Sequence, residues 1–204
     1  PEEAFLWTRP VDRTPDVPLY LEVRFESGLP VALDGEELSP VTLVEILSRL
    51  AGEHGVGRID HIEDRLVGIK SREVYEAPAA AVLLPAHRTL EAMTLSRDQL
   101  RFKEGVALEY AELVYNGLWY SAHRRDLQAY VASTQPYISG DVRVRLHKGR
   151  ATVVGVRSPH ALYQHDLATY SASDLFDQSA SPGFIHLWGL PVRVQAQVQG
   201  EEGK

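Results

Sequence analysis

The sequence contains no cysteine and one methionine, Met93. Without cysteine, the chain has no disulfide bond, no thiolate zinc site and no cysteine nucleophile. This is compatible with a reducing cytoplasm, which is the location we expect. Because the chain begins at Pro1 and its methionine is internal, we expect a processed product or a piece of a longer protein. A missing upstream region could hold half of any active site.

Long apolar runs and clusters of basic residues are also lacking. No apolar segment approaches the roughly 20 residues that a spanning helix needs, and the acidic, proline-bearing N-terminus does not resemble a signal peptide. Lysine and arginine number 21 against 28 acidic residues, which gives a net charge of -7. The basic residues are scattered, so we expect neither a membrane nor a nucleic acid among the partners.

The composition of the chain is typical of a globular protein. Hydrophobic residues make up 44% and charged residues 24% of the 204 residues, and a chain of this length can bury a core without covalent staples. Prolines and the lack of periodicity predict an extended arm over residues 1–18. We expect one domain over 19–190 and a C-terminal tail over 191–204.

The apolar pattern predicts an α+β fold with a mixed, largely antiparallel sheet and packed helices. Alternation predicts strands at 19–26 and 30–34 and a hairpin within 140–158. Ser39 and Pro40 predict the start of a helix that stops near Gly55. Further helices are expected over about 78–94 and 121–135, and an amphipathic segment over 107–121. The segment after Ser96 fits a helix or a strand, as does 184–199, and 158–180 is expected to be irregular or short-helical.

Residues 55–78 alternate charged and apolar side chains, which indicates a strand, a turn and a strand, with 59–63 and 65–71 extended. Gly55 and Gly57 follow a helix rather than a strand, so they stop that helix and do not cradle a phosphate.

No serine-nucleophile motif, phosphate-binding loop or histidine pair at metal-ligand spacing occurs in the sequence. We therefore assign no catalytic residue, no metal ligand and no cofactor to this chain alone.

The charged hairpin leaves two interpretations open. Glu63 and Tyr75 could line a pocket for an ammonium group, with possible support from four cations: Arg58, Arg65, Lys70 and Arg72. Alternatively, the charges simply face water and pair weakly. Chemistry alone favours the second interpretation.

Several long strings resemble the C-terminal part of argininosuccinate synthase, from about Leu19 to about Leu190. They are "HGVGRIDHIEDRLVGIKSREVYEAPAA", "LPAHRTLEAMTL", "YAELVYNGLWYS" and "GFIHLWGL". The resemblance implies an ATP-dependent ligase of arginine biosynthesis and the urea cycle. In that family the ureido oxygen of citrulline attacks ATP to give a citrulline adenylate and pyrophosphate. The amine of aspartate then displaces AMP.

The resemblance also implies which substrates each domain of the enzyme binds. The family's S-G-G-x-D-[ST] pyrophosphate loop is absent, so ATP with its Mg²⁺ and aspartate would be bound mainly by a separate N-terminal nucleotide-binding domain. This chain would contribute citrulline binding through Glu63 and Tyr75, which match the family's positions and spacing, and would help to build a homotetramer. The alternative is a non-catalytic binding and assembly module, inactive without the nucleotide-binding domain.

Two departures from the family pattern stand out. Glu73 and the stretch 77–80 replace glycines and a threonine, which makes the segment after Tyr75 more helix-prone. The sequence after Leu190 is short and polar where the family commonly has a tetramer-clasping extension.

Overall fold

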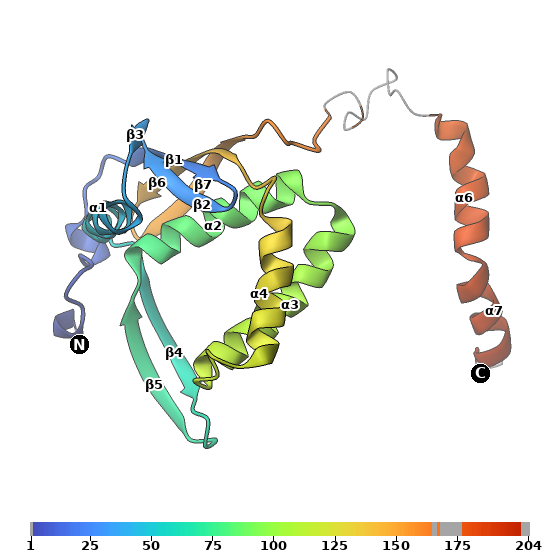
Figure 1. The fold of residues 1–204 in the computed structure, drawn as a ribbon, viewed down its shortest axis with the longest axis horizontal. Helices are drawn as coiled ribbons and strands as arrows, with labels where there is room; N and C mark the ends of the chain where they lie inside the picture. Colours follow the sequence, from blue (N-terminus) through green and yellow to red (C-terminus); the bar gives the residue numbers. More distant parts are fainter. Residues whose placement is uncertain (1, 165–166, 168–176, 201–204) are drawn as a thin grey trace. The chain divides into compact units, whose positions relative to one another are not determined.

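The computed structural model describes residues 2–164, 167 and 177–200 (Figure 1). The chain divides into two compact units, Pro1–Leu162 and Tyr163–Lys204. The division falls inside residues 19–190, so the assignment of one domain to that range, with an arm before it and a tail after it, stays a prediction. Among the described residues, no helix is long and apolar enough to cross a membrane.

The first unit is built on a five-stranded sheet with the order β3-β2-β1-β6-β7. The strands are β1 (Leu19–Glu26), β2 (Leu29–Leu33), β3 (Glu36–Glu37), β6 (Gly140–His147) and β7 (Arg150–Arg157). Short turns join β1 to β2 and β6 to β7, and a short turn forces the strands it joins to run antiparallel. The α+β class is confirmed. The described strands pair only antiparallel, without the parallel pairing of a mixed sheet.

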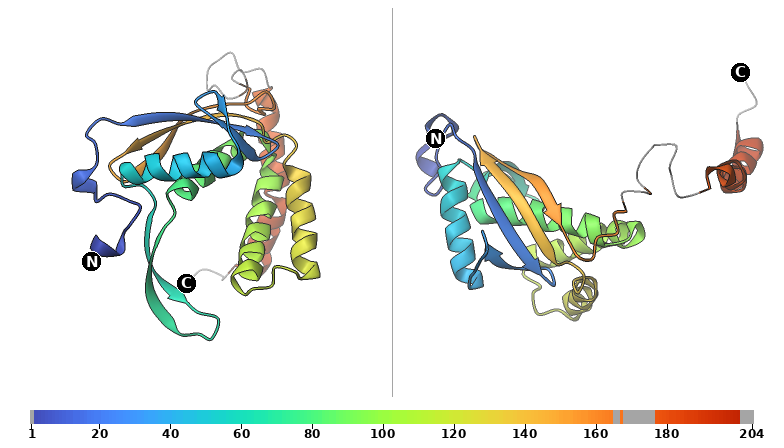
Figure 2. Two further views of the ribbon diagram at one scale, coloured as in Figure 1. Left: turned by 60° about the vertical axis from the view of Figure 1, so that its left-hand side comes forward. Right: turned by 90° about the horizontal axis from the view of Figure 1, so that it is seen from above.

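Helices α1 (Pro40–Glu53) and α2 (Pro78–Thr94) pack against this sheet (Figures 1 and 2). In β1 every second residue from Leu21 is buried and its neighbours are exposed, as the alternation predicts. These side chains and those of β6 meet both helices in one core, whose largest fully buried members include Phe25, Leu43, Leu47, Leu90 and Leu146. The sheet, α1 and α2 thus share one hydrophobic core.

Capping residues explain where the helices begin. Ser39 accepts the backbone N–H of Thr42 at the start of α1, and Ser96 forms a capping box with Gln99 at the start of α3 (Arg97–Tyr115). The ambiguity after Ser96 is thus resolved as a helix. The last helix of this unit, α4 (Ala122–Thr134), starts after Ser121 as predicted. Helix α3 ends before Gly117, whose φ of 72° reverses the chain.

Strands β4 (Arg58–Asp64) and β5 (Lys70–Glu76) form a separate two-stranded hairpin that extends away from the main sheet (Figure 1). We expected residues 65–71 to be extended, and this is wrong for residues 65–69. Residues 65–69 turn the chain, because Gly68 takes a φ of 77° and its N–H donates to the carbonyl of Arg65 at 2.7 Å. The strand after the turn begins at Lys70.

The second unit contains the short helix η3 (Gln178–Ala180), α6 (Ser181–Trp188) and α7 (Leu190–Gln199). The segment 184–199, which fitted a helix or a strand, is therefore helical. Within the range expected to be irregular or short-helical, residues 158–164 are irregular, η3 is short-helical, and residues 165–166 and 168–176 lie outside the described residues. The rings of Phe184 and Trp188 stack one turn apart on α6.

Candidate functional site

Glu63 and Tyr75 lie on the same face of the β4–β5 hairpin. The antiparallel register pairs Glu63 with Ser71 and Ile59 with Tyr75. Paired residues share a face and alternate residues return to it. The face therefore also carries His61 opposite Glu73, and the ring of Tyr75 meets that of His61 edge-on at 5.7 Å.

Two tyrosines hold the carboxylate of Glu63. The hydroxyl of Tyr75 donates to Oε2 at 2.5 Å, and the hydroxyl of Tyr115 donates to Oε1 at 2.5 Å. Tyr115 is the last residue of α3, 52 positions away along the chain. Residues Tyr75 and Tyr115 remain 46% and 52% exposed, so a ligand can reach the cluster from solvent.

These hydrogen bonds fix the protonation of the cluster. The bond from Tyr115, followed by that from Tyr75, holds the pKa of Glu63 below its ordinary value. The same contact with the carboxylate raises the pKa of Tyr75 to about 12 and also raises the pKa of Tyr115. Deprotonating either phenol would place two negative charges side by side. At neutral pH the cluster is therefore one carboxylate and two intact phenols.

An ionised carboxylate has about four acceptor positions, and the two phenols use only one on each oxygen. Glu63 therefore keeps the capacity to accept N–H bonds from a cationic group, and the phenol rings provide an apolar wall next to it. The arrangement suits the binding of an ammonium group. It offers no nucleophile and no phosphate cradle.

The four candidate supporting cations separate into three environments. Lys70 pairs with Asp64 at 3.0 Å and Arg72 pairs with Asp60 at 2.6 Å, both on the hairpin face opposite Glu63. Arg65 lies in the turn and pairs with Glu73 on the same face as Glu63. Of these three cations, only Arg65 lowers the pKa of Glu63 through its charge.

Arg58, the fourth candidate, binds the N-terminal arm. Its guanidinium donates to the hydroxyl and the carbonyl of Thr8 at 2.8 and 2.7 Å, pairs with Glu2 at 2.6 Å and lies over the ring of Phe5. In this structure Arg58 anchors the arm at the base of the hairpin, and among the described side chains it makes no hydrogen bond or ion pair with Glu63 or Tyr75. Its role as a supporting residue stays a prediction.

Sequence reasoning did not find Tyr115. The segment around it was identified as amphipathic, and its apolar side was assigned through Tyr110 and Leu113. The only sequence signal at Tyr115 is its place directly before Asn116 and Gly117, which end the helix. A phenol at a helix end has no partner that can be named before the hairpin and the helix are placed in space.

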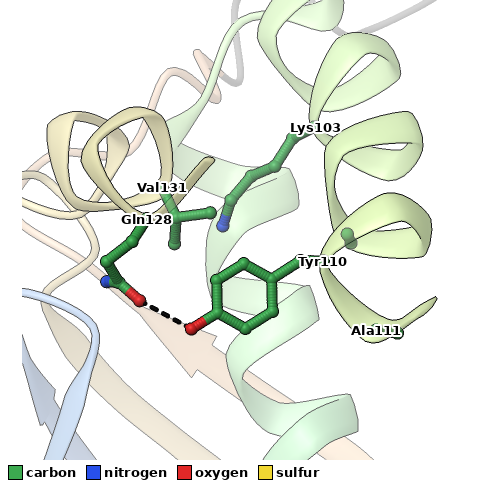
Figure 3. Close-up of a pocket in the computed structure, with 6 residues that line it drawn as sticks. Lys103, Tyr110, Ala111, Gln128 and Val131 are labelled. Carbon is green, nitrogen blue, oxygen red and sulfur yellow. Dashed lines mark hydrogen bonds between the residues drawn. The ribbon is translucent and has the colours of Figure 1, made fainter. Parts of the chain in front are cut away.

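A second feature, a hollow of about 350 Å³, lies between α3 and α4. Figure 3 shows the hydroxyl of Tyr110 donating to Oε1 of Gln128 across it, at 2.9 Å. Its wall is mostly apolar and consists of Lys103, Ala107, Tyr110, Ala111, Gln128 and Val131. None of these residues belongs to the Glu63 cluster, so the two features are separate.

The comparison with known families decides the membership of the chain. A model described as the arginosuccinate synthase C-terminal domain matches residues 1–195. The chain belongs to this family. The resemblance drawn from the motifs is confirmed.

Similar argininosuccinate synthases cover nearly the whole chain. That of Dehalococcoides mccartyi (strain ATCC BAA-2266 / KCTC 15142 / 195) is 59% identical over 197 residues, which is 97% of this chain and 48% of the relative. That of Gloeobacter violaceus (strain ATCC 29082 / PCC 7421) is 58% identical over 199 residues, 98% of this chain and 50% of the relative. The chain thus spans about half the length of the argininosuccinate synthases that it matches.

Proposed function

We propose that this chain is the C-terminal part of an argininosuccinate synthase, the ATP-dependent ligase that joins citrulline to aspartate through a citrulline adenylate in arginine biosynthesis. Its own contribution is one side of the citrulline pocket, formed by Glu63 and Tyr75. Family membership supports the activity. The observation that carries the site is the ionised carboxylate of Glu63, held by Tyr75 on an exposed hairpin face.

The chemistry of citrulline suits this cluster. Its amino-acid end carries an ammonium group, which donates to carboxylates in charge-assisted hydrogen bonds. Glu63 accepts one of these N–H groups while Tyr75 keeps the carboxylate oriented. Binding at this end would leave the ureido group free to face the nucleotide-binding half. The chain's role is thus to position the substrate, which can contribute a large part of a rate enhancement without a nucleophilic side chain.

We assign ATP, its Mg²⁺ and most contacts to aspartate to the nucleotide-binding half that this chain does not span. No group of three or more histidine or acidic side chains able to hold a metal gathers within residues 2–164 and 177–200. We therefore propose no residue of this chain as a ligand of Mg²⁺. In the cytoplasm, the location we expect, the chain would work together with its nucleotide-binding domain.

The second candidate role is assembly. Large apolar side chains line the α6–α7 segment, and each remains more than half exposed: Phe184, Ile185, Leu187, Trp188, Val192, Val194 and Val198. Apolar surface of this kind is typical of a subunit interface. We propose that this segment contributes to a homotetramer, and that the chain has no ligase activity in isolation.

Kinetics of the full-length enzyme test the site. Glu63→Gln keeps the shape of the side chain but removes its charge, so the KM for citrulline should rise about 10- to 100-fold, the cost of a charge-assisted hydrogen bond. Tyr75→Phe should raise it about 3- to 10-fold by removing a neutral donor. The KM for ATP should stay close to that of the wild type, because the substitutions leave nucleotide binding intact.

Asp64→Asn is the matched control. Asp64 is the next residue along β4, carries the same charge and pairs with Lys70 on the opposite face. Its citrulline KM should be that of the wild type. Unchanged citrulline kinetics in both Glu63→Gln and Tyr75→Phe, or an equal effect in Asp64→Asn, would contradict the site.

A further inference from the structure

We infer that Tyr115 is a positioning residue of the citrulline pocket, and that it sets the place and orientation of the Glu63 carboxylate. The inference rests on the proposed function, because it concerns the same carboxylate. It adds a residue from another element, α3, to a site that the sequence placed entirely on the hairpin.

The hairpin is held to the rest of its unit at two places. Its base is tied down where Glu76 and Arg58 bind the arm and where the N–H of Ala77 donates to the carbonyl of Gly57. Farther along β4, the bond from Tyr115 to Glu63 is the hydrogen bond that connects the hairpin to another element among the described residues. Because β4 and β5 pair only with each other in the described sheets, losing this bond removes the hydrogen bond that joins the outer half of the hairpin to α3.

Tyr115 is itself held on a fixed support. Asn116 donates from its side chain to Glu112 at 2.7 Å, and the N–H of Leu118 donates to the carbonyl of Leu113 at 2.8 Å, which closes the end of α3. Farther back on the helix, Lys103 forms an ion pair with Glu91 of α2. A phenol on a packed helix can thus define the position of a side chain on a projecting hairpin.

The two phenols together define the carboxylate plane. Tyr75 is on the hairpin and moves with Glu63, so it orients the carboxylate only within the hairpin. Tyr115 is on α3 and therefore fixes the carboxylate relative to the helices. With one phenol on each oxygen, rotation of the carboxylate would break a hydrogen bond, so the free acceptor positions keep one direction.

The experiment is Tyr115→Phe in the full-length enzyme, with Tyr120→Phe as the control. Tyr120 is 90% exposed on the segment after α3, and its hydroxyl makes no hydrogen bond with the described residues. For Tyr115→Phe the citrulline KM should rise about 3- to 10-fold, as expected for one lost donor. The KM values for ATP and aspartate should stay unchanged, and Tyr120→Phe should match the wild type.

The pH profile separates positioning from a merely structural role. The groups that act on Glu63 are Tyr115 from α3 and, on the hairpin, Tyr75, His61, Arg65 and Glu73. Removing the Tyr115 hydroxyl takes away the largest influence that lowers the pKa of Glu63. The carboxylate then takes up a proton at a higher pH, so the acid limb of kcat/KM for citrulline should move to higher pH in Tyr115→Phe.

A double variant provides the second measurement. If Tyr115 acts through Glu63, then Glu63→Ala combined with Tyr115→Phe should have the same citrulline KM as Glu63→Ala alone. Effects of the two substitutions that multiply would overturn the inference. So would a Tyr115→Phe enzyme that raises the KM of all three substrates without moving the acid limb.

The outcomes also separate the inference from the function on which it rests. A raised citrulline KM in Glu63→Gln and Tyr75→Phe together with wild-type kinetics and pH profile in Tyr115→Phe would refute the role of Tyr115 and leave the pocket in place. Wild-type citrulline kinetics in all three variants would refute the pocket itself.

Discussion

At the scale of single residues, Glu76 fastens the N-terminal arm to the hairpin through one carboxylate. It accepts the backbone N–H groups of Leu6, Trp7 and Thr8 at 2.7 to 3.0 Å and the hydroxyl of Thr8 at 2.6 Å. Burial alone would raise the pKa of Glu76, but the hydrogen bonds outweigh it and hold the pKa below its ordinary value. The fastening is thus present above the ordinary pKa of a glutamate and is lost as the pH falls through the folded value.

We predict that Glu76→Gln loosens the arm. Because an amide accepts weaker hydrogen bonds than a carboxylate, local opening should become easier by about 1–2 kcal/mol. Trypsin should then cleave the full-length enzyme after Arg13 about tenfold faster, which gel electrophoresis can follow. Glu3→Gln, an exposed substitution in the same arm, is the control. Equal cleavage rates in the two variants would refute the fastening role.

From the sequence, candidate site residues on one element could be brought together, but contacts between elements could not be predicted. Strand periodicity places Glu63 and Tyr75 on one hairpin face, and the structure brings them into contact. The same alternation places Lys70 and Arg72 on the opposite face of the hairpin from Glu63 and Tyr75. Tyr115 and the arm contacts of Arg58 depend on how distant segments pack, which no local pattern encodes.

At the scale of elements, Gly57 sets the junction between the hairpin and α2. Its φ is 111°, and a Cβ built there would lie 2.4 Å from Cα and 2.6 Å from N of Pro78. A side chain would therefore strain the backbone and also push away the first residue of α2. The hairpin that carries Glu63 can leave the body at this point only with a glycine.

We predict that Gly57→Ala destabilises the full-length enzyme by more than about 2 kcal/mol, because it combines an unfavourable φ with a backbone clash. Gly68→Ala is the matched control: its φ of 77° is also positive, but no atom lies within 4 Å of a Cβ there. It should cost only about 1 kcal/mol. Thermal unfolding should rank the two variants in this order. A loss of stability in Gly57→Ala no larger than that in Gly68→Ala would contradict the clash.

Elements with clear end signals were predictable from sequence, and those without were not. Ser39 with Pro40 and the alternation of β1 and β6 located α1 and the central strands. The turn at 65–69 was misjudged because an apolar, β-prone run surrounds Gly68 and hides its left-handed backbone. The segment 184–199 fitted a helix or a strand, since apolar residues there are too frequent to define one period.

At the scale of the whole molecule, the proposed function makes the chain one part of a larger enzyme. It spans about half of the argininosuccinate synthases that it matches, and its candidate site is an exposed face with one wall. A substrate pocket normally buries most of its ligand. Under the proposed function, the other wall is expected from the nucleotide-binding half, and the cluster on this chain would position the substrate without supplying a reacting group.

The most direct measurement is a crystal structure of the full-length enzyme with citrulline bound. The account predicts that the ammonium group of citrulline lies within hydrogen-bond distance of Glu63, and that Tyr75 and Tyr115 still donate to the carboxylate. Citrulline bound elsewhere, with the face of Glu63 and Tyr75 open to solvent, would contradict it.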